Sequence, residues 1–247
     1  MLDAFRYLRA SLSEFYYELP RMVLLNLIWF LFSLPLIFIA FVAFTVIRGA
    51  PPGLWAIFAL QAVLPVAAAL ALAGPATAAV YYCTNRLAHG ELLEVRQFWP
   101  AFRRFLWRGW LLALADLGLG LLLVLNVWFY WSIGQPGLWI LSVIFAYLLV
   151  LWFMVQGYLF SLLVELNQPV RLVIRNALFM VIDKLGLTLG LTIVNLLIVL
   201  LSVLTPLAGL LLPLAMMVLL SSVNNKAVVE AVERYRAAGR IIPSEPQ

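Results

Sequence analysis

The basic residues of this chain alternate between the gaps that separate its long apolar runs. Of its 16 Lys and Arg residues, 15 fall in every second gap, and Arg48 alone falls in the other set. This alternation is typical of multipass membrane proteins, whose cytoplasmic loops are rich in Lys and Arg. It predicts a polytopic protein of the cell (cytoplasmic) membrane with both termini in the cytoplasm.

The composition excludes an ordinary soluble domain. Hydrophobic residues make up 66% of the 247 residues and charged residues 11%, with a mean hydropathy of +1.06. Soluble domains are about 45–50% apolar and about 25% charged. The net charge of +5 does not indicate nucleic acid, because the basic residues are spread over four membrane-proximal segments. The lipid bilayer and its anionic headgroups are the expected partner.

Six apolar runs are long enough to cross a bilayer, since about 20 helical residues span its hydrocarbon core. They are Met22–Ile47, a segment within Leu54–Tyr82, Trp107–Trp131, Leu138–Val164, and residues 185–204 and 207–223. Thr205-Pro206 separates the last two, because one straight helix would be about twice as long as the core is thick. The first run exceeds the about 7–15 apolar residues of a signal peptide, so we expect it to be retained.

An amphipathic stretch precedes each pair of runs. The apolar faces are Phe5, Leu8, Leu12, Phe15, Tyr16 and Leu19; then Val95, Phe98, Phe102 and Phe105; then Val170, Val173, Ala177, Leu178 and Val181. The opposite faces carry Arg6 and Arg9; Arg96, Arg103 and Arg104; and Arg171 and Arg175. We therefore expect three membrane hairpins, each preceded by a helix that lies in the cytoplasmic interface.

The predicted fold is an all-α membrane bundle of about six transmembrane helices. Residues 1–240 form a single integral-membrane domain, and residues 241–247 are expected to be a disordered tail. Beyond the last span a helix should continue from Val223 to Ala238, because Glu230 and Arg234 are spaced i,i+4.

Four stretches of the chain resemble the YesL-like family of uncharacterised bacterial membrane proteins. They are Leu25–Trp29, Ser33–Pro35, Gly74–Tyr82 and Phe98–Phe105. The resemblance covers about residues 1–240 and implies a multipass bacterial protein, frequently encoded near carbohydrate uptake systems. It implies no activity and no site residues. Extra apolar sequence at Ala50–Leu72 departs from the family pattern and leaves the path of the second span open.

Asp116 is the one carboxylate well inside a predicted span. An ionisable residue in lipid is costly, and is a functional candidate by default. Ala113 and Gly120 lie on the same helix face, where small residues favour close helix contact. Two interpretations stay open: a hydrogen-bonded or protonated acid that joins helices, which is simpler, and a proton or solute site. Its candidate neighbours are Asn26, Asn126 and Asn195.

A polar stripe of Thr188, Thr192 and Asn195 runs along the fifth predicted span. On the same helix Gly186 and Gly190 form a pair of small residues four apart. Helix packing explains both features more simply than a permeation path.

Common catalytic and cofactor motifs are missing from the sequence, among them GxGxxG, GxxxxGK[ST], GxSxG and HExxH. The one cysteine, Cys83, excludes an internal disulfide. The one histidine, His89, lacks further ligands at metal-binding spacing and is expected in a solvated loop. We therefore expect no enzyme activity, no cofactor and no metal.

Two functions fit these observations. The first is a non-enzymatic accessory or scaffold protein whose membrane partner is, for example, a carbohydrate transport system. The alternative is a small-solute or proton-coupled transporter that uses Asp116 and the polar stripe.

Overall fold

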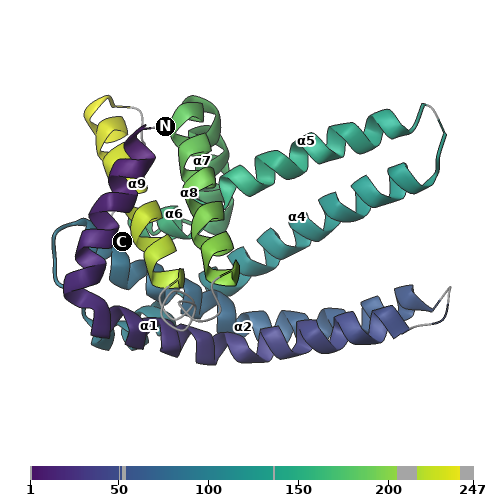
Figure 1. Cartoon of the computed structure of the whole chain (residues 1–247), viewed down its shortest axis with the longest axis horizontal. Coiled ribbons are helices and arrows are strands. Elements are labelled where there is room, and N and C mark those ends of the chain that lie inside the picture. The colour runs from purple at the N-terminus through teal and green to yellow at the C-terminus, as the bar shows by residue number, and fades with distance from the viewer. Residues whose placement is uncertain (1, 50, 52–53, 136, 205–215, 240–247) are drawn as a thin grey trace.

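The computed structural model describes residues 2–49, 51, 54–135, 137–204 and 216–239, and their regular secondary structure is entirely helical (Figure 1). The elements are α1 (Leu2–Gly49), α2 (Trp55–Ala88), the 3₁₀ helix η1 (Val95–Gln97), α3 (Phe98–Arg104), α4 (Leu106–Ser132), α5 (Trp139–Val155), α6 (Leu159–Leu166), α7 (Val170–Asp183), α8 (Leu185–Leu204) and α9 (Met216–Ala237). The all-α prediction is confirmed for this part of the chain. The predicted tail at residues 241–247 lies outside it.

Three helices are individually long and apolar enough to cross a membrane. They are Tyr17–Val46 within α1, Leu60–Ala88 within α2, and α4. Two further pairs meet the criterion together: α5 with α6, bent by 45°, and α7 with residues 185–201 of α8, bent by 106°. The described residues thus hold three to five candidate spans. The predicted break at Thr205-Pro206 lies outside these residues, and so does the beginning of the sixth predicted span, 207–223.

Two helical hairpins project from one packed end of the molecule (Figure 1). Hairpins α1/α2 and α4/α5 extend to the right in this view, whereas α7, α8, α9 and the beginning of α1 gather at the left. The buried apolar cluster belongs mostly to the packed end, for example Leu25 of α1, Val80 of α2 and Val228 of α9. The hairpin arms instead expose large side chains such as Phe38 and Trp131. Surfaces of this kind suit lipid better than water.

The two hairpins contact each other at Gly74 of α2 and Gly109 of α4, so no side chain separates the two backbones there. A Cβ added to Gly74 would lie 2.6 Å from the carbonyl oxygen of Gly109, and one added to Gly109 would lie 3.0 Å from Cα of Pro75. Helix α2 runs unbroken through Pro65 and Pro75. Membrane helices tolerate proline because neighbouring groups satisfy the freed carbonyls. The second candidate span therefore follows one continuous helix, which answers the question left by the extra apolar sequence.

Helix α1 joins the first amphipathic stretch to the first candidate span. Its backbone leaves helical geometry at Glu18, where φ is −106° and ψ is 15°. Pro20 follows two residues later and explains the kink, because a proline ring clashes with the carbonyl four residues before it. The stretch before Glu18 can therefore take a direction different from that of the span.

The second and third amphipathic stretches agree in part with the predicted faces, since Leu178, predicted on the apolar face of α7, is exposed. In α3 and the residue after it, Phe98, Phe102 and Phe105 are buried. In α7, Val173 and Val181 are buried. The arginines on the opposite faces, Arg96, Arg103, Arg104, Arg171 and Arg175, are all exposed.

The beginning of α1 divides its faces differently. Here the buried residues are Ala4, Tyr7 and Ser11, whereas Phe5 and Leu12 are each 47% exposed. This stretch packs on the protein through Ala4, Tyr7 and Ser11. Of its predicted apolar face, Leu8 packs against the core, whereas Phe5 and Leu12 point outward. Periodicity alone does not distinguish these two apolar environments, protein and lipid.

Helix α9 lies inside the packed end and contacts α1, α2, α6 and α8. Most of its residues are buried, from Val218 to Tyr235. The predicted helical continuation past residue 223 is confirmed, and Arg234 does donate to Glu230. The central position of α9 was not predicted, because its sequence is that of a polar helical extension and not of a buried core helix.

Candidate functional site

Asp116 links α4 to α5. One carboxylate oxygen, Oδ1, accepts hydrogen bonds from Nε1 of Trp152 at 2.9 Å and from Nε2 of Gln156 at 2.7 Å. Both donors come from the next helix along the hairpin and its C-terminal end. The simpler interpretation of Asp116, an acid that joins two helices, agrees with these contacts.

The asparagines expected beside Asp116 make their hydrogen bonds elsewhere. Asn26 is buried, and its side-chain oxygen accepts a bond from the backbone N–H of Met217, at the start of α9. Asn126 is half-buried and donates to the carbonyl of Leu122 in its own helix. Asn195 faces α9. The proposed neighbours were wrong because proximity between spans depends on packing angles that the sequence does not show.

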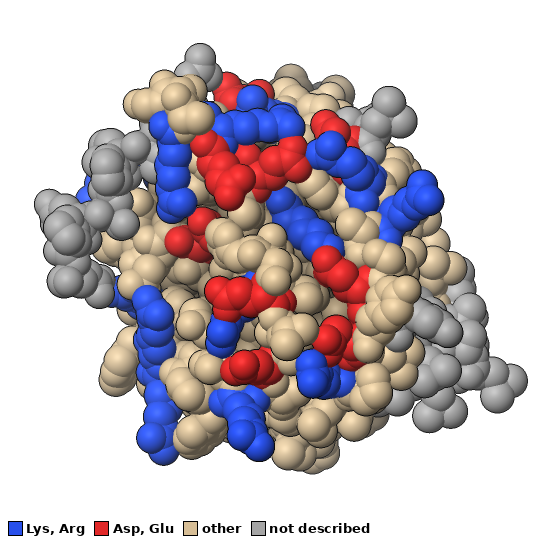
Figure 2. All heavy atoms as spheres, turned by 90° about the vertical axis from the view of Figure 1, so that its left-hand side faces the viewer, with Lys and Arg blue, Asp and Glu red and all other residues tan. Residues whose placement is uncertain are grey.

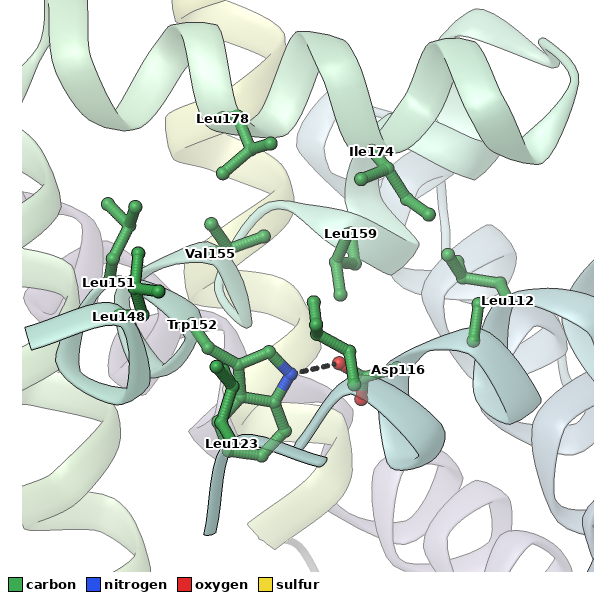
Figure 3. A pocket seen from close by; sticks show the side chains of 12 residues that line it. Leu112, Asp116, Leu123, Leu148, Leu151, Trp152, Val155, Leu159, Ile174 and Leu178 are labelled. Carbon is green, nitrogen blue, oxygen red and sulfur yellow. Dashed lines mark hydrogen bonds between the residues drawn. The ribbon is translucent and has the colours of Figure 1, made fainter. Parts of the chain in front are cut away.

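Asp116 also lines an apolar groove, which we call the Asp116 groove. Its volume is about 270 Å³. Its lining comes from α4, α5, α6 and α7 and consists of Leu112, Ala115, Asp116, Leu119, Leu123, Leu148, Leu151, Trp152, Val155, Leu159, Ile174 and Leu178 (Figure 3). Asp116 is the one ionisable residue of this lining. An apolar pocket with one placed polar group is the usual form of a small-molecule site.

Gly120 allows the Trp152 ring to lie against α4. A Cβ added at Gly120 would lie 2.7 Å from Cζ2 of this ring. The small-residue face predicted around Asp116 is thus used for close contact, as expected. The partner in that contact is a tryptophan side chain rather than a helix backbone.

The predicted stripe on α8 faces other helices. Thr188 is buried, and its hydroxyl pairs with the Tyr158 hydroxyl at 2.9 Å. Thr192 donates to the carbonyl of Thr188 within the helix. Asn195 donates to Oδ1 of Asn224 on α9 at 3.0 Å. Gly186 differs from expectation, because a Cβ added there would meet no atom within 4 Å.

Asn195 belongs to a larger group of polar side chains between α2, α8 and α9. This polar core consists of Tyr81, Thr84, Asn195, Ser221, Asn224 and Asn225. Asn224 donates to the Tyr81 hydroxyl at 3.2 Å, and Asn225 donates to the Tyr81 carbonyl at 2.7 Å and to Thr84 Oγ1 at 2.8 Å. Thr84 in turn donates to Ser221. Sequence reasoning missed this core, although the run Ser221-Ser222-Val223-Asn224-Asn225 was a visible signal at the end of an apolar segment.

The break between α5 and α6 brings the two polar sites near each other. Gln156 bonds to Asp116, and the next residue, Gly157, borders the polar core. A Cβ added to Gly157 would lie 3.4 Å from Nδ2 of Asn195 and 3.5 Å from Oδ1 of Asn224. A glycine at the break therefore lets both asparagines approach the backbone. Interrupted helices are a common place for solute and ion sites in membrane proteins.

An ionic cluster joins the beginning of α1 to α9. Arg6 contacts Glu230 at 2.9 Å, and the Tyr7 hydroxyl donates to Glu230 at 2.8 Å. Burial, with the hydrogen bond to Glu230, raises the pKa of Tyr7 to about 12. Burial alone would raise the pKa of Glu230, but the Tyr7 hydrogen bond and the charges of Arg6 and Arg234 outweigh it. The pKa of Glu230 therefore lies below its ordinary value of 4.5.

This lowered pKa predicts a pH-dependent loss in the variant Glu230→Gln. Because the folded-state pKa is depressed, the ionised carboxylate stabilises the fold above pH 4.5, and this contribution disappears as the pH falls through the folded pKa. At pH 7 we expect the variant to lose less than about 1 kcal/mol, since the cluster is partly exposed. Thermal unfolding in detergent at pH 7 and at pH 3.5 measures the difference.

The matched control for this prediction is Glu233→Gln. Glu233 is exposed on the same helix and forms no ion pair within the described ranges. Its replacement should leave stability unchanged at both pH values. Equal losses for the two variants, or a Glu230→Gln loss that does not decrease as the pH falls from 7 to 3.5, would contradict the assigned role of Glu230.

His89 lies in an exposed turn after α2, as expected, and it also has a carboxylate partner. Its Nε2 lies 3.0 Å from Oε2 of Glu165, a carboxylate whose side chain is only 5% exposed. Asn85 donates to the same oxygen, and Arg236 lies 3.6 Å from the other. The histidine thus helps to hold α6 against the end of α2. Within the described residues no three His, Cys, Asp or Glu side chains gather as a metal site would require.

No protein-family model matches the chain, and no curated protein or solved structure matches it. The resemblance to the YesL-like family therefore rests on the four sequence stretches that carry it. Function must be inferred from the side chains and their contacts.

Proposed function

We propose that the protein is a six-span protein of the bacterial cytoplasmic membrane, arranged as three hairpins that each follow a cytoplasmic interfacial helix. The kink at Glu18 and the 106° bend between α7 and α8 support this arrangement, because each gives the amphipathic stretch a direction of its own. The α3–α4 junction at Phe105 supports it in the same way. The sixth span would occupy residues 207–223.

The distribution of charge supports an orientation with both termini in the cytoplasm. Basic and acidic side chains gather on the end of the molecule opposite the tips of the hairpins (Figure 2). Among the described residues, Arg48 in the last turn of α1 is the one basic residue near the tip of a hairpin. Lys and Arg remain predominantly on the cytoplasmic side of membrane proteins. The packed, charged end is then the cytoplasmic end.

Within this arrangement the protein acts as a non-enzymatic scaffold or accessory protein for a membrane partner. The observation that carries this proposal is the rigid construction of the charged end. Ion pairs connect α1 and α9 at Arg6–Glu230 and at Glu14–Lys226, the latter at 2.6 Å. Arg103 of α3 and Arg175 of α7 are also exposed. A fixed surface of mixed charge favours specific docking. The family resemblance suggests a carbohydrate transport system as the partner.

Site-specific photo-crosslinking tests the scaffold proposal. A photoreactive amino acid replaces Arg9, Arg103 or Arg175 in the full chain, and crosslinks are formed in intact cells. We expect the same partner protein at all three positions, with a yield that falls when unlabelled protein is overproduced. A probe at Gln135, exposed in the turn between α4 and α5, is the control and should not capture that partner. Equal capture at Gln135, or lipid adducts alone at every position, would refute the proposal.

A second candidate function is transport of a small solute or proton with Asp116 as its central group. The observation that favours it is the placement of Asp116 in an apolar groove, next to a helix break that borders the polar core. Carboxylates in that setting are typical of solute and proton pathways.

A further inference from the structure

The Asp116 groove presents a single carboxyl group among apolar walls. Leucines line it from α4 and α5, and Ile174 and Leu178 close it from α7. The Trp152 ring forms part of the wall beside the carboxylate (Figure 3). The volume of about 270 Å³ suits a small organic molecule.

The charge of Asp116 is not neutralised by a neighbour. Among the described residues Asp116 forms no ion pair, and its two hydrogen-bond donors, Trp152 and Gln156, are both uncharged. Both donors bind Oδ1, so Oδ2 keeps its acceptor capacity. A carboxylate in apolar surroundings is costly unless a cation or further donors compensate it.

The groove opens at the surface of the α4/α5 hairpin, which would face lipid in the proposed arrangement. Ala115 and Leu119 of α4 and Leu148 of α5 lie on its rim and are exposed. A ligand with an apolar body can therefore enter from the hydrocarbon phase and needs no water-filled channel. A strongly hydrated inorganic cation has no such route.

We propose that the Asp116 groove binds a small hydrophobic monocation, an amine or quaternary ammonium with an aromatic or branched apolar body. The cationic head would lie at Asp116 and beside the Trp152 ring, whose π face also attracts cations. The apolar body would contact Leu123, Leu151 and Leu159. This inference deepens the second candidate function, but it requires only binding and not transport.

Equilibrium dialysis with the full chain in lipid nanodiscs tests the inference. The probe is radiolabelled benzyltrimethylammonium, and the competitor is neopentylbenzene, which has the same shape without the charge. After subtraction of empty nanodiscs, we expect saturable binding of the cation to one site per chain. Neopentylbenzene should not displace it. Asp116→Asn should weaken binding at least tenfold, since the amide has no net charge and still offers an oxygen to Trp152 and Gln156.

Two further variants distinguish a loss of binding caused by the missing charge from one caused by a change in the fold. Ala115→Phe keeps Asp116 but fills the groove, and should also abolish saturable binding. Glu233→Gln removes one carboxylate outside the groove and should bind as the native chain does. Equal affinity of the native chain and Asp116→Asn, or displacement by neopentylbenzene, overturns the inference and indicates a groove for neutral chains. If Asp116→Asn unfolds, undiminished binding by Ala115→Phe overturns it as well.

Uptake of the same cation into reconstituted vesicles distinguishes binding from transport. Binding without uptake upholds the inference and refutes the second candidate function for this ligand class. If the native chain shows no saturable binding and Asp116→Asn takes up the cation as fast as the native chain, the inference is overturned. Transport through another site would then remain consistent with the result.

Discussion

Replacing Gly74 with alanine is expected to destabilise the protein by about 2–3 kcal/mol, the upper part of the range for overpacked sites. The new methyl group would lie 2.6 Å from the Gly109 carbonyl oxygen and 2.9 Å from Cβ of Ala113. Two of the three nearest atoms belong to backbone, so no side chain can rotate away to relieve the contact. Helices α2 and α4 must therefore separate, which loosens the junction between the two hairpins. Thermal unfolding in detergent, followed by circular dichroism, measures the loss.

Gly118→Ala is the matched control. Gly118 lies in α4, on the partner helix of Gly74, but a Cβ added there meets no atom within 4 Å. Alanine favours a helix over glycine by up to about 1 kcal/mol, so this variant should be neutral or slightly more stable. The two identical substitutions should therefore act in opposite directions. If Gly74→Ala is as stable as Gly118→Ala, the close crossing of α2 and α4 is not a feature of the folded protein.

The apolar runs predicted the helical class and three to five of the candidate spans, because each depends only on local composition. Proline and periodicity also carry local information, which is why the faces of α3 and α7 were predicted in part. The beginning of α1 was harder, since Phe5 and Leu12 are apolar but turn away from the protein. Apolar residues are favoured both in lipid and in the protein interior. Only their neighbours in the folded protein show which of the two environments a residue occupies.

The candidate site depends on long-range contacts, and there the sequence was less informative. Asp116 was recognised as exceptional by its type alone, but its partner Trp152 looked like one more apolar aromatic residue. The two residues are 36 positions apart, and their contact also requires Gly120 to leave space for the ring. The number and angle of helix contacts, which decide such pairings, follow from the packing of the whole chain.

The polar core was missed for a related physical reason. Asn224 and Asn225 stand at the beginning of a stretch rich in charged residues, where polar side chains usually face water. In the folded protein Asn225 is fully buried because Tyr81 and Thr84 of α2 accept both of its N–H donors. A buried amide is stable only when other segments satisfy it, so its burial cannot be deduced from its own neighbours in sequence.

Asn225→Ala is therefore expected to cost about 2 kcal/mol of stability. The substitution removes two hydrogen bonds and leaves the Tyr81 carbonyl and the Thr84 hydroxyl with fewer partners. Each unsatisfied buried group costs about 1–3 kcal/mol. The loss is smaller than the sum, because Asn225 Oδ1 itself accepts no hydrogen bond among the described residues and its removal relieves one buried polar atom. Thermal unfolding in detergent measures the loss.

Asn126→Ala is the control for this change, with the same atoms removed. Asn126 is half-buried, and its side-chain hydrogen bond goes to Leu122 of its own helix rather than to another segment, so its loss should stay within about 0.5 kcal/mol. From the sequence alone Asn126, inside a predicted span, would rank above Asn225, which begins a charged stretch. Equal losses would mean that the polar core does not hold α9 in place. A loss confined to Asn225 would establish α9 as a structural centre of the protein rather than as its tail.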